Sequence, residues 1–408
     1  MNADVAVIGA GALGLSTALH CALLGRSVVV LDRRAPGSQA SGRAAGLFKS
    51  VQGDEIRTFL ARRSIEKVRT FEQWAGVPLP LAESGSLLVA RSAGHKALLA
   101  AEAAQSRGWG VELAAISPAE AAERSGGYCQ PAGDEDAVWC PEDVYIEEPS
   151  WLIDSYTGAC QRLGVEVLAD EAVTAVLTTG GAISGLDTVA RRIDTPVVVD
   201  AAGAWVRQVG ALAGARVAAA PVRHQLLITE PTAEVPASAP IARVLDHAVY
   251  LRPARGGLMV GGFEARPLPV DPRTEPPDFD TDSVPLDLGV LRQMTVDVAR
   301  QVPVAAQAAV AEHRGGMFTM SPDGRFLAGP VPEVPGLWVA SGCNGSGFSS
   351  SPAIGEVLAG WISSGQPGRD MSALAPSRFG PLPDEMLVER GIWQYAHYYD
   401  PVTAPPAG

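Results

Sequence analysis

The hydrophobic pattern near the N-terminus predicts a strand, a helix and a second strand. Residues 5–8 form a short apolar run, residues 14–24 carry apolar side chains at helical spacing, and residues 27–31 form a second apolar run. Continuous apolar runs of this length are typical of strands buried on both faces. Gly25 provides a stop for the intervening helix. The pattern therefore predicts a β-α-β unit at the start of an α/β fold.

Later segments predict a second kind of sheet. "TPVVVDAAGAW" (195–205) contains another buried parallel strand, whereas "AVYLRP" (248–253) and "GLMVGGFE" (257–264) are typical of paired antiparallel strands around a glycine-rich turn. We find no internal repeat and no low-complexity region. The proline-rich segment 366–408, with "WQYAHYYDP" near its end, is predicted to lie along the surface.

Composition narrows the class of protein. The 408 residues allow two domains, or one domain interrupted by another. A formal net charge of −13 disfavours nucleic acid or an anionic membrane as a partner. The apolar segment 5–24 contains three glycines and His20 and lacks a basic start, so we expect neither a signal peptide nor an anchor.

The cysteines give no metal or disulfide framework. None of the five has C-x-x-C spacing, which favours reduced thiols, a cytoplasmic location and no metal site. Cys343 lies in "SGCNGSGFSSSPAIGEV", where a nucleophile, a metal ligand or a flavin attachment point could each be considered. Because it has no neighbouring His or second Cys, we interpret it as a small buried thiol.

A nucleotide fingerprint lies between the first strand and the first helix. Gly9 permits a tight turn, Gly11 allows close approach of a pyrophosphate, and Gly14 allows close helix–strand packing. Asp32 ends the second strand, where it can accept hydrogen bonds from a ribose hydroxyl. The stretch predicts FAD or NAD and disfavours NADP, since an acid at this position leaves no obvious place for a 2′-phosphate.

A second loop, "GSQASGRAAGLF", follows shortly after Asp32. It offers hydrogen-bond donors at Ser38, Ser41 and Arg43, and its glycines at 42 and 46 allow close backbone approach. We interpret it as a second set of contacts along a long cofactor, with a flexible surface turn as the alternative.

Together these pieces resemble the D-amino acid oxidase superfamily of FAD-dependent oxidoreductases, in its glycine oxidase, sarcosine oxidase and dimethylglycine oxidase/dehydrogenase branch. The resemblance covers most of the chain. Besides the two loops above, the matching pieces are "ESGSLLVA", "CPEDVYIEEPSWL", "VVVDAAGAW", "PVRHQLLITEP", "VYLRPARGGLMVGGFE" and "MFTMSPDGRFLAGP".

The resemblance implies an α/β (α+β) fold with two domains. A Rossmann-like FAD-binding domain would take residues 1–80, 146–216 and 318–365. An inserted mixed-sheet substrate domain would take residues 81–145 and 217–317, leaving 366–408 as the surface tail.

The resemblance also implies a set of FAD contacts. Gly316 occupies the position of the cysteine that joins FAD covalently in monomeric sarcosine oxidases, so we expect non-covalent FAD. The implied contacts are Gly9, Ala10, Gly11, Ala12, Leu13, Gly14, Asp32, Arg33, Ser38, Ser41, Gly42, Arg43, Ala45, Gly46, Leu47, Val173, Ala202, Gly203, Trp205, Gly345, Ser346, Gly347, Phe348 and Ser349.

Four residues are implied in catalysis. His224 and Tyr250 match the histidine and tyrosine that dimethylglycine oxidases carry beside the flavin, where an imidazole and a phenol can hold the substrate amine or relay its proton. Arg252 should share a strand face with Tyr250 and could bind a substrate carboxylate. Lys49 and Arg57, after the second loop, lie where sarcosine oxidases carry an arginine for that carboxylate, and Lys49 is the one we assign to the site.

Besides Gly316, three residues depart from the family pattern. Met259 stands at the position of a lysine associated with oxygen activation in sarcosine oxidases, and Ser346 and Ser349 replace the His and Lys of "SGHGFK". In the same stretch, Ser351 and Pro352 are expected to cap and begin a helix whose positive end faces the flavin.

These features predict an FAD-dependent amine oxidase or dehydrogenase that oxidises a C–N bond of an N-methylated or secondary amino acid. Its partners would be a small amine and O2 or another electron acceptor, and the protein would be a monomer or homo-oligomer. The alternatives are a primary amino acid (glycine or D-amino acid) oxidase, a non-catalytic flavin-binding accessory subunit and an NAD-linked dehydrogenase.

Overall fold

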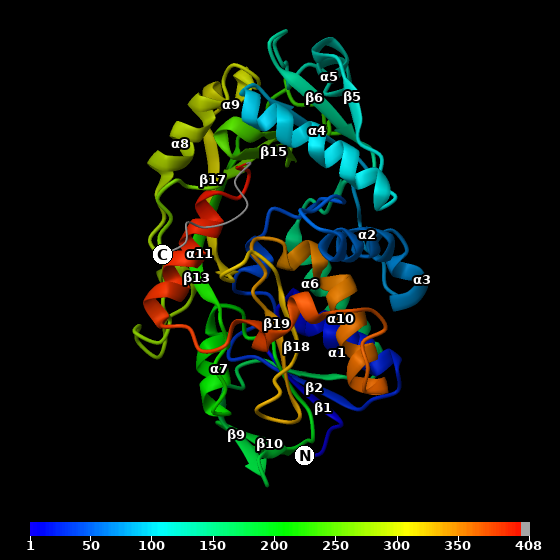
Figure 1. Ribbon diagram of the computed structural model, residues 1–408, viewed down its shortest axis with the longest axis vertical. Helices are drawn as coiled ribbons and strands as arrows, with labels where there is room; N and C mark the ends of the chain where they lie inside the picture. Colours follow the sequence, from blue (N-terminus) through cyan, green and yellow to red (C-terminus); the bar gives the residue numbers. More distant parts are fainter. Residues whose placement is uncertain (401–408) are drawn as a thin grey trace.

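Two large sheets form the two halves of the molecule in the computed structural model, which describes residues 1–400 (Figure 1). The six-stranded sheet is parallel except for its edge strand β18, which runs antiparallel to β19. The order is β18 (Leu327–Pro330), β19 (Leu337–Ser341), β12 (Val198–Asp200), β1 (Val5–Ile8), β2 (Val28–Leu31) and β8 (Glu166–Leu168).

The central strands of this sheet bury every residue, as their apolar sequences predict. On one face α1 packs on α6 and α10, and α10 packs on α2. On the other face lie α7 and a three-stranded antiparallel sheet. These elements are α1 (Ala12–Leu23), α2 (Glu55–Arg69), α6 (Pro149–Arg162), α7 (Val206–Leu212), α10 (Gly347–Ser364), β9 (Val173–Thr179), β10 (Ala182–Thr188) and β11 (Arg192–Asp194).

The eight-stranded sheet is antiparallel apart from the parallel pair β14 and β4. Its β15 and β16 form the hairpin that the sequence predicts. The order is β17 (Val310–Met320), β13 (Ala220–Thr229), β16 (Gly257–Gly262), β15 (Val249–Ala254), β14 (Ile241–Val244), β4 (Ser86–Ala90), β6 (Asp136–Cys140) and β5 (Ala114–Ile116).

Shorter elements complete the fold. A two-stranded sheet joins β3 (Leu47–Phe48) to β7 (Val144–Tyr145). It connects the end of the second loop, residues 37–48, to a segment about 100 residues further along the chain. The remaining α-helices are α3 (Phe71–Ala75), α4 (Ala93–Gly108), α5 (Pro118–Arg124), α8 (Leu288–Asp297), α9 (Pro303–Gln307) and α11 (Asp384–Ala396).

Strand β17 crosses the expected domain boundary at 317/318 and ends at Met320, and the boundary itself stays a prediction. One expectation about the C-terminal third is corrected. The segment after residue 365 does not simply follow the surface: α11 packs on β13 and β17 and buries Leu387, Gly391 and Tyr395. These residues are spaced four apart, which places them on one face of the helix. Residues 401–408 of the expected surface tail lie outside the described part.

The start of α10 also differs from the expectation at Ser351 and Pro352. The helix begins at Gly347, so Pro352 lies inside it. Proline has no N–H for the carbonyl of Phe348, and the Ser351 hydroxyl donates to that carbonyl instead, at 2.9 Å. The next N–H, of Ala353, donates to Ser64 Oγ at 3.1 Å. The side chains of Ser351 and Ser64 thus form hydrogen bonds in place of the main-chain bonds that are lost at Pro352.

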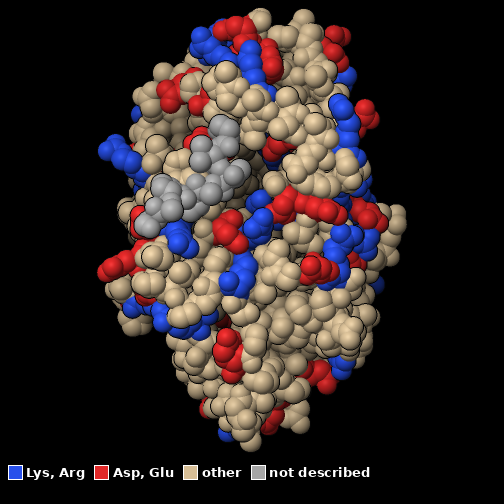
Figure 2. Space-filling model, viewed as in Figure 1, with Lys and Arg blue, Asp and Glu red and all other residues tan. Residues whose placement is uncertain are grey.

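Surface charge is mixed. On the face shown in Figure 2, acidic and basic side chains are interspersed without a continuous field of one sign. Within residues 1–400, no helix is both long and apolar enough to cross a membrane.

Candidate active site

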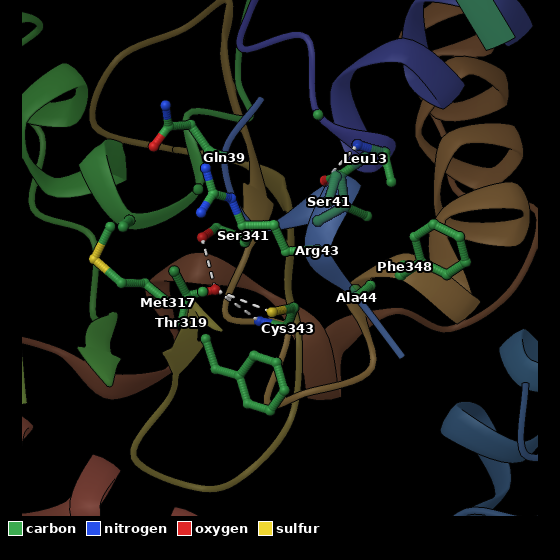
Figure 3. Close-up of a pocket in the computed structure, with 18 of the residues that line it drawn as sticks. Leu13, Gln39, Ser41, Arg43, Ala44, Met317, Thr319, Ser341, Cys343 and Phe348 are labelled. Carbon is green, nitrogen blue, oxygen red and sulfur yellow. Dashed lines mark hydrogen bonds between the residues drawn. The ribbon is translucent and has the colours of Figure 1, made fainter. Parts of the chain in front are cut away.

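A cavity of about 560 Å³ extends from the glycine loop after β1 to the face of the eight-stranded sheet. It is lined at one end by Gly9, Gly11 and Asp32, and at the other by His224 and Tyr250. Figure 3 shows the middle of this wall, where Ser41 and Arg43 from the second loop lie across from Thr319 and Cys343. The cavity therefore brings together the two regions that the sequence predicts as cofactor site and reaction site.

The glycine loop is shaped by close backbone approach. Gly9 has φ +109°, and a Cβ there would lie 2.4 Å from the carbonyl oxygen of Ala201. A Cβ on Gly14 would lie 1.9 Å from the carbonyl oxygen of Gly9. No side chain fits at either position. Because both residues are glycine, the loop lies close to the end of β12, and its other side lines the cavity.

Asp32 fixes this loop from the end of β2. Its Oδ2 accepts a hydrogen bond from the Ala10 N–H at 2.7 Å, and its Oδ1 accepts one from the Arg34 N–H at 2.8 Å. Burial raises the pKa of the Asp32 carboxyl, against the two N–H donors. Each carboxylate oxygen keeps a further lone pair, so the group that anchors the loop can also accept from a ribose hydroxyl.

The N-terminus of α1 faces the cavity. Ser41 Oγ accepts from the Ala12 N–H at 3.0 Å, which joins the second loop to the first turn of the helix. Gly11, Ala12 and Leu13 line the cavity beside it. A helix N-terminus with a neighbouring hydroxyl suits the charge of a pyrophosphate.

Arg33 and Trp205 line this half of the cavity together. The Arg33 guanidinium lies 4.1 Å from the ring centroid of Trp205. Val173, Ala202 and Gly203 line the same region. An aromatic ring stacked by a cation, with small residues around it, provides a surface for a planar base.

The loop before α10 and the first turn of that helix form the opposite wall, where Gly345, Ser346, Gly347, Phe348 and Ser349 line the cavity. Asn344 turns this loop with a φ of +45°. Its Oδ1 accepts from the Ser321 N–H at 2.9 Å, and its own N–H donates to the Thr319 carbonyl at 2.9 Å. The side chain and main chain of Asn344 thus hold the loop against the end of β17.

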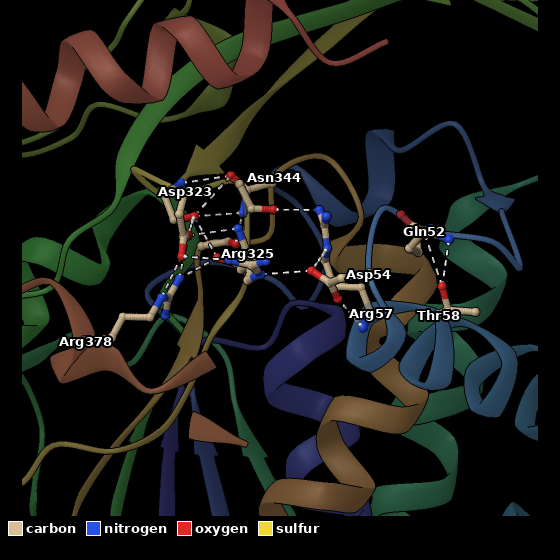
Figure 4. Close-up of polar contacts among 11 residues, drawn as sticks. Gln52, Asp54, Arg57, Thr58, Asp323, Arg325, Asn344 and Arg378 are labelled. Carbon is tan, nitrogen blue, oxygen red and sulfur yellow. Dashed lines mark hydrogen bonds and ion pairs between the residues drawn. The ribbon is translucent and has the colours of Figure 1, made fainter. Parts of the chain in front are cut away.

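A charged network supports the same loop from outside the cavity (Figure 4). Arg378 donates to Asp323 at 2.8 Å, and Arg325 donates to Asp54 at 2.9 Å. Arg57 pairs with Asp54 and also donates to the Gly324 carbonyl, each at 2.9 Å. Segments from three parts of the chain are therefore fixed around the loop that carries the cavity wall.

Two of the predicted catalytic residues meet at the other end of the cavity. His224 Nε2 lies 2.8 Å from Tyr250 Oη, and His224 Nδ1 lies 2.7 Å from Tyr395 Oη. Phe318 stacks on the imidazole with ring centroids 4.1 Å apart. Burial lowers the pKa of His224 to about 3 and raises the pKa of Tyr250, so both groups are neutral at physiological pH.

Gly261 explains how Tyr250 reaches His224. Tyr250 on β15 is paired with Gly261 on β16, and Gly261 is paired with Leu226 on β13. A Cβ on Gly261 would lie 2.3 Å from Tyr250 Oη. The glycine therefore lets the tyrosine lie across β16 towards the strand that carries His224.

The two predicted cationic residues have different positions. Lys49 lines the cavity and is paired with Glu102 at 3.5 Å. Arg252 does not line it: its guanidinium donates to the carbonyls of Ala45, Glu147 and Pro253 at 2.8, 2.7 and 2.6 Å. The expectation that Arg252 binds a substrate carboxylate is therefore corrected, because these carbonyls already use its donors in the protein interior.

Sequence reasoning missed two other arginines of the cavity wall. Arg314 on β17 has a side chain only 10% exposed, pairs with Glu312 at 3.3 Å and leaves its Nε without a partner. Arg243 on β14 pairs with the buried Asp143 at 2.9 Å. The alternation of side chains along a strand could have indicated part of this. In the observed register, Arg314 and Arg243 lie in the same row across the sheet as Tyr250.

The C-terminal segment was also missed as part of the site. Tyr398 and Tyr399 line the cavity, and Tyr398 stacks on Phe263 with centroids 4.0 Å apart. The only signal in the sequence is the aromatic density of "WQYAHYYDP".

The remaining predicted positions divide between the cavity wall and the interior behind it. Ser346 lines the cavity and lies 3.4 Å from Tyr398 Oη, and Ser349 donates to the Ser346 carbonyl at 3.1 Å. Cys343 also lines the cavity, where Thr319 donates to its sulfur at 3.3 Å, so it is a wall residue rather than a buried thiol. Of the expected contacts, those behind the wall are Ala10, Gly14, Ser38 and Gly42; the departure at Met259 is fully buried in a separate apolar cluster.

Comparison with known proteins now identifies the family. Residues 4–361 match the FAD dependent oxidoreductase family DAO, and the chain belongs to that family. It is 30% identical over 377 residues to 4-methylaminobutanoate oxidase (formaldehyde-forming) from Paenarthrobacter nicotinovorans, covering 91% of this chain and 45% of that protein. It is 28% identical to mitochondrial sarcosine dehydrogenase from Mus musculus, covering 93% and 41%. The chain thus spans less than half the length of these two relatives.

Solved structures share the fold. L-proline dehydrogenase from P. horikoshii superimposes with a TM-score of 0.83 at 23% identity, covering 93% of this chain and 98% of that one. Glycine oxidase from Geobacillus kaustophilus gives a TM-score of 0.80 at 21% identity, covering 93% and 100%. The mixed α/β architecture predicted from the sequence is confirmed.

The residues present fit FAD. The glycine loop and the N-terminus of α1 suit the pyrophosphate, Asp32 suits the ribose, and Arg33 with Trp205 suits the adenine. The remaining cavity, between the loop before α10 and the face that carries His224, is left for the isoalloxazine. Among residues 1–400, no cluster of His, Cys, Asp or Glu could hold a metal ion.

Proposed function

We propose that this protein is an FAD-dependent oxidase or dehydrogenase that oxidises the C–N bond of an N-methylated or secondary amino acid or amine. The observation that carries the proposal is the neutral His224–Tyr250 pair at the flavin end of the cavity. Bound FAD would supply the acceptor for the hydride that leaves the carbon next to the substrate nitrogen. The resulting imine is then hydrolysed by water.

His224 and Tyr250 are suited to hold the substrate amine. The amine must be deprotonated before a hydride can leave its neighbouring carbon. A phenol hydrogen-bonded to a neutral imidazole can bind the amine and relay that proton, although neither group holds it. Because neither group is charged, neither repels an incoming ammonium.

The shape and composition of this end of the cavity support a methylated amine. Phe263 and Phe318 pack against the ring of His224, and Tyr398 and Tyr399 pack on Phe263. All four line the cavity. Aromatic faces attract alkylated ammonium groups and accommodate their methyl groups, whereas a small primary amine gains less from them. The names of the two relatives, a methylaminobutanoate oxidase and a sarcosine dehydrogenase, also favour an N-methylated substrate.

A carboxylate on the substrate would need a cation near Tyr250. Arg314 suits this role better than Arg252, since its Nε is buried without a partner at the cavity wall. Lys49 is the second candidate, although Glu102 neutralises part of its charge. Both assignments belong to the proposal.

We further propose that FAD is bound non-covalently, chiefly by residues 1–80, 146–216 and 318–365, and that residues 81–145 and 217–317 form the substrate side. Gly316 has no side chain to form a bond with the flavin, which supports non-covalent binding. Acid precipitation should therefore release all the flavin into the supernatant, whereas yellow colour retained in the pellet would contradict this part.

A cytoplasmic location, use of O2 or another electron acceptor, and a monomeric or homo-oligomeric state complete the proposal. The five free cysteines favour a reducing compartment. Light scattering of the purified holoenzyme would give the oligomeric state.

The test is anaerobic mixing of the purified yellow holoenzyme with a panel of amines. We expect sarcosine, dimethylglycine or a longer N-methyl amino acid to bleach the flavin, and glycine and D-alanine to leave it oxidised. Bleaching by glycine or D-alanine alone would favour a primary amino acid oxidase, and no bleaching by any amine would favour an accessory subunit. Admission of air then separates an oxidase, which regains its colour fast, from a dehydrogenase.

A further inference from the structure

Tyr395 reaches the reaction site from the C-terminal helix. On α11, a Cβ on Gly391 would lie 2.9 Å from the Ala220 Cβ, so the helix lies almost directly on β13. One turn later, Tyr395 is on the same helix face and its hydroxyl lies 2.7 Å from His224 Nδ1. Tyr395 is fully buried. The close helix–sheet contact thus delivers a phenol to the side of His224 that faces away from Tyr250.

The hydrogen bonds of His224 link the two phenols. A neutral imidazole carries one proton on its two nitrogens, so one nitrogen donates and the other accepts. If Tyr395 donates to Nδ1, the proton is on Nε2, which then donates to Tyr250 and leaves the Tyr250 O–H free for the cavity. If Tyr395 accepts from Nδ1–H, Tyr250 must donate to Nε2 and offers the cavity only its oxygen. The direction of the Tyr395–His224 hydrogen bond therefore decides whether Tyr250 presents its O–H or only its oxygen to the cavity.

We propose that Tyr395 is a positioning residue: through His224 it fixes the direction of the Tyr250 hydroxyl in the cavity. The ring contacts agree with this role, because Phe318 stacks on the imidazole and Phe263 lies beside both His224 and Tyr395. These rings fix the plane of the imidazole, and Tyr395 then sets its tautomer. Tyr395 itself does not line the cavity.

The first test is independent of any substrate. Holoenzyme labelled with 15N-histidine is compared as wild type and Tyr395→Phe, with His224→Gln to assign the His224 signals. We expect one His224 tautomer in the wild type and a changed tautomer ratio in Tyr395→Phe. A mixed tautomer in the wild type, or identical His224 shifts in the two proteins, would overturn the proposal. The wild-type measurement decides even where the variant does not fold.

The second test is kinetic and rests on the proposed function. With an amine that bleaches the wild type, Tyr395→Phe should lower the anaerobic flavin-reduction rate by about tenfold while the substrate Kd stays within about threefold. A reduction rate within twofold of wild type, or a loss of rate that merely follows a loss of bound FAD, would overturn it. If no amine reduces the wild type, the proposed function fails and the 15N measurement alone decides on Tyr395.

The matched control is Tyr128→Phe. Tyr128 is as deeply buried as Tyr395, and its hydroxyl donates to the Pro240 carbonyl at 2.6 Å, away from the cavity. The Tyr128→Phe variant loses the same hydroxyl group as Tyr395→Phe, and with it one buried hydrogen bond. We expect Tyr128→Phe to keep the wild-type His224 shifts and reduction rate; an effect equal to that of Tyr395→Phe would show a general consequence of losing a buried phenol and would overturn the assignment.

Discussion

Nε2 of His224 lies 2.8 Å from Oη of Tyr250, and each residue is only 5% exposed. Two neutral polar groups can share this apolar end of the cavity because each satisfies the other. Removal of one leaves the other buried without its partner, which costs about 1–3 kcal/mol. The pair is therefore both a structural unit and the proposed reaction centre.

Tyr250→Phe should slow anaerobic flavin reduction by about a hundredfold, because a group that accepts or directs a proton contributes at least this much to a reaction rate. FAD content should stay at the wild-type level, since Tyr250 lies at the end of the cavity away from the glycine loop. Stopped-flow reduction and the flavin-to-protein absorbance ratio provide the two measurements. Wild-type reduction rates in Tyr250→Phe would remove the residue from the mechanism.

Arg252→Met should lower stability and leave substrate affinity unchanged in the protein that folds. The substitution leaves the carbonyls of Ala45, Glu147 and Pro253 without donors, and we expect a loss of about 3 kcal/mol in the free energy of unfolding. Urea denaturation measures this loss. Arg314→Met is the counterpart, with a smaller loss of stability and a weaker Kd for carboxylate-bearing amines. The opposite pattern, weak binding in Arg252→Met and normal binding in Arg314→Met, would restore the carboxylate role to Arg252.

Gly9→Ala should abolish FAD binding. The added Cβ would lie 2.4 Å from the Ala201 carbonyl oxygen, at a φ of +109° that alanine rarely adopts. The loop would have to move away from β12, and its pyrophosphate contacts would move with it. The purified variant is expected to be colourless. Gly164→Ala is the control, because that glycine also has a positive φ but a Cβ there meets nothing within 4 Å; its flavin content should be normal.

Acid should destabilise the protein through two buried histidines. Burial lowers the pKa of His20 and of His224 to about 3, whereas an unfolded histidine has a pKa near 6.5. Between these values the unfolded chain binds more protons, so the stabilisation is complete above about pH 6.5 and is lost as pH falls towards 3. Each histidine contributes up to about 1.4 kcal/mol per pH unit in this window.

The measurement is the free energy of unfolding between pH 7.5 and 5, each value in the same salt. His20→Gln should show a flatter dependence than wild type in this range. His95→Gln is the control, because His95 lies beside Asp246 at 3.1 Å and outside the apolar core. Equal slopes in wild type and His20→Gln would contradict the buried neutral state of His20.

Local patterns predicted the nucleotide half well. The strand at residues 5–8 is β1 as predicted, and the second strand differs by one residue, because short apolar runs between a glycine loop and a turn have few alternatives. The helix begins two residues earlier than predicted, at Ala12, where Ser41 from the second loop satisfies its first turn. Such a long-range partner leaves no signal in the local sequence.

Prediction from the sequence was weakest where the role of a residue depends on which distant groups its side chain meets. Arg252 alternates correctly along its strand, yet its side chain turns to three main-chain carbonyls, which no periodicity reveals. Ser351 and Pro352 form a typical helix start, but the Ser351 hydroxyl and Ser64 replace the lost main-chain bonds and let α10 begin earlier. In both cases a tertiary partner overrides a sound local preference.

The sequence by itself determined the nucleotide loop, the strands beside it and the pairing of β15 with β16, because glycine conformation and side-chain alternation are local properties. Only the tertiary structure decided that Tyr250 lies across Gly261 to His224, and that the hydroxyl of Tyr395, 171 residues further along the chain, lies beside His224 Nδ1. It also decided that the Arg252 guanidinium donates to three main-chain carbonyls. The reason is that a hydrogen bond depends on distance and direction in space, and segments far apart in sequence acquire these only when the sheets and helices pack.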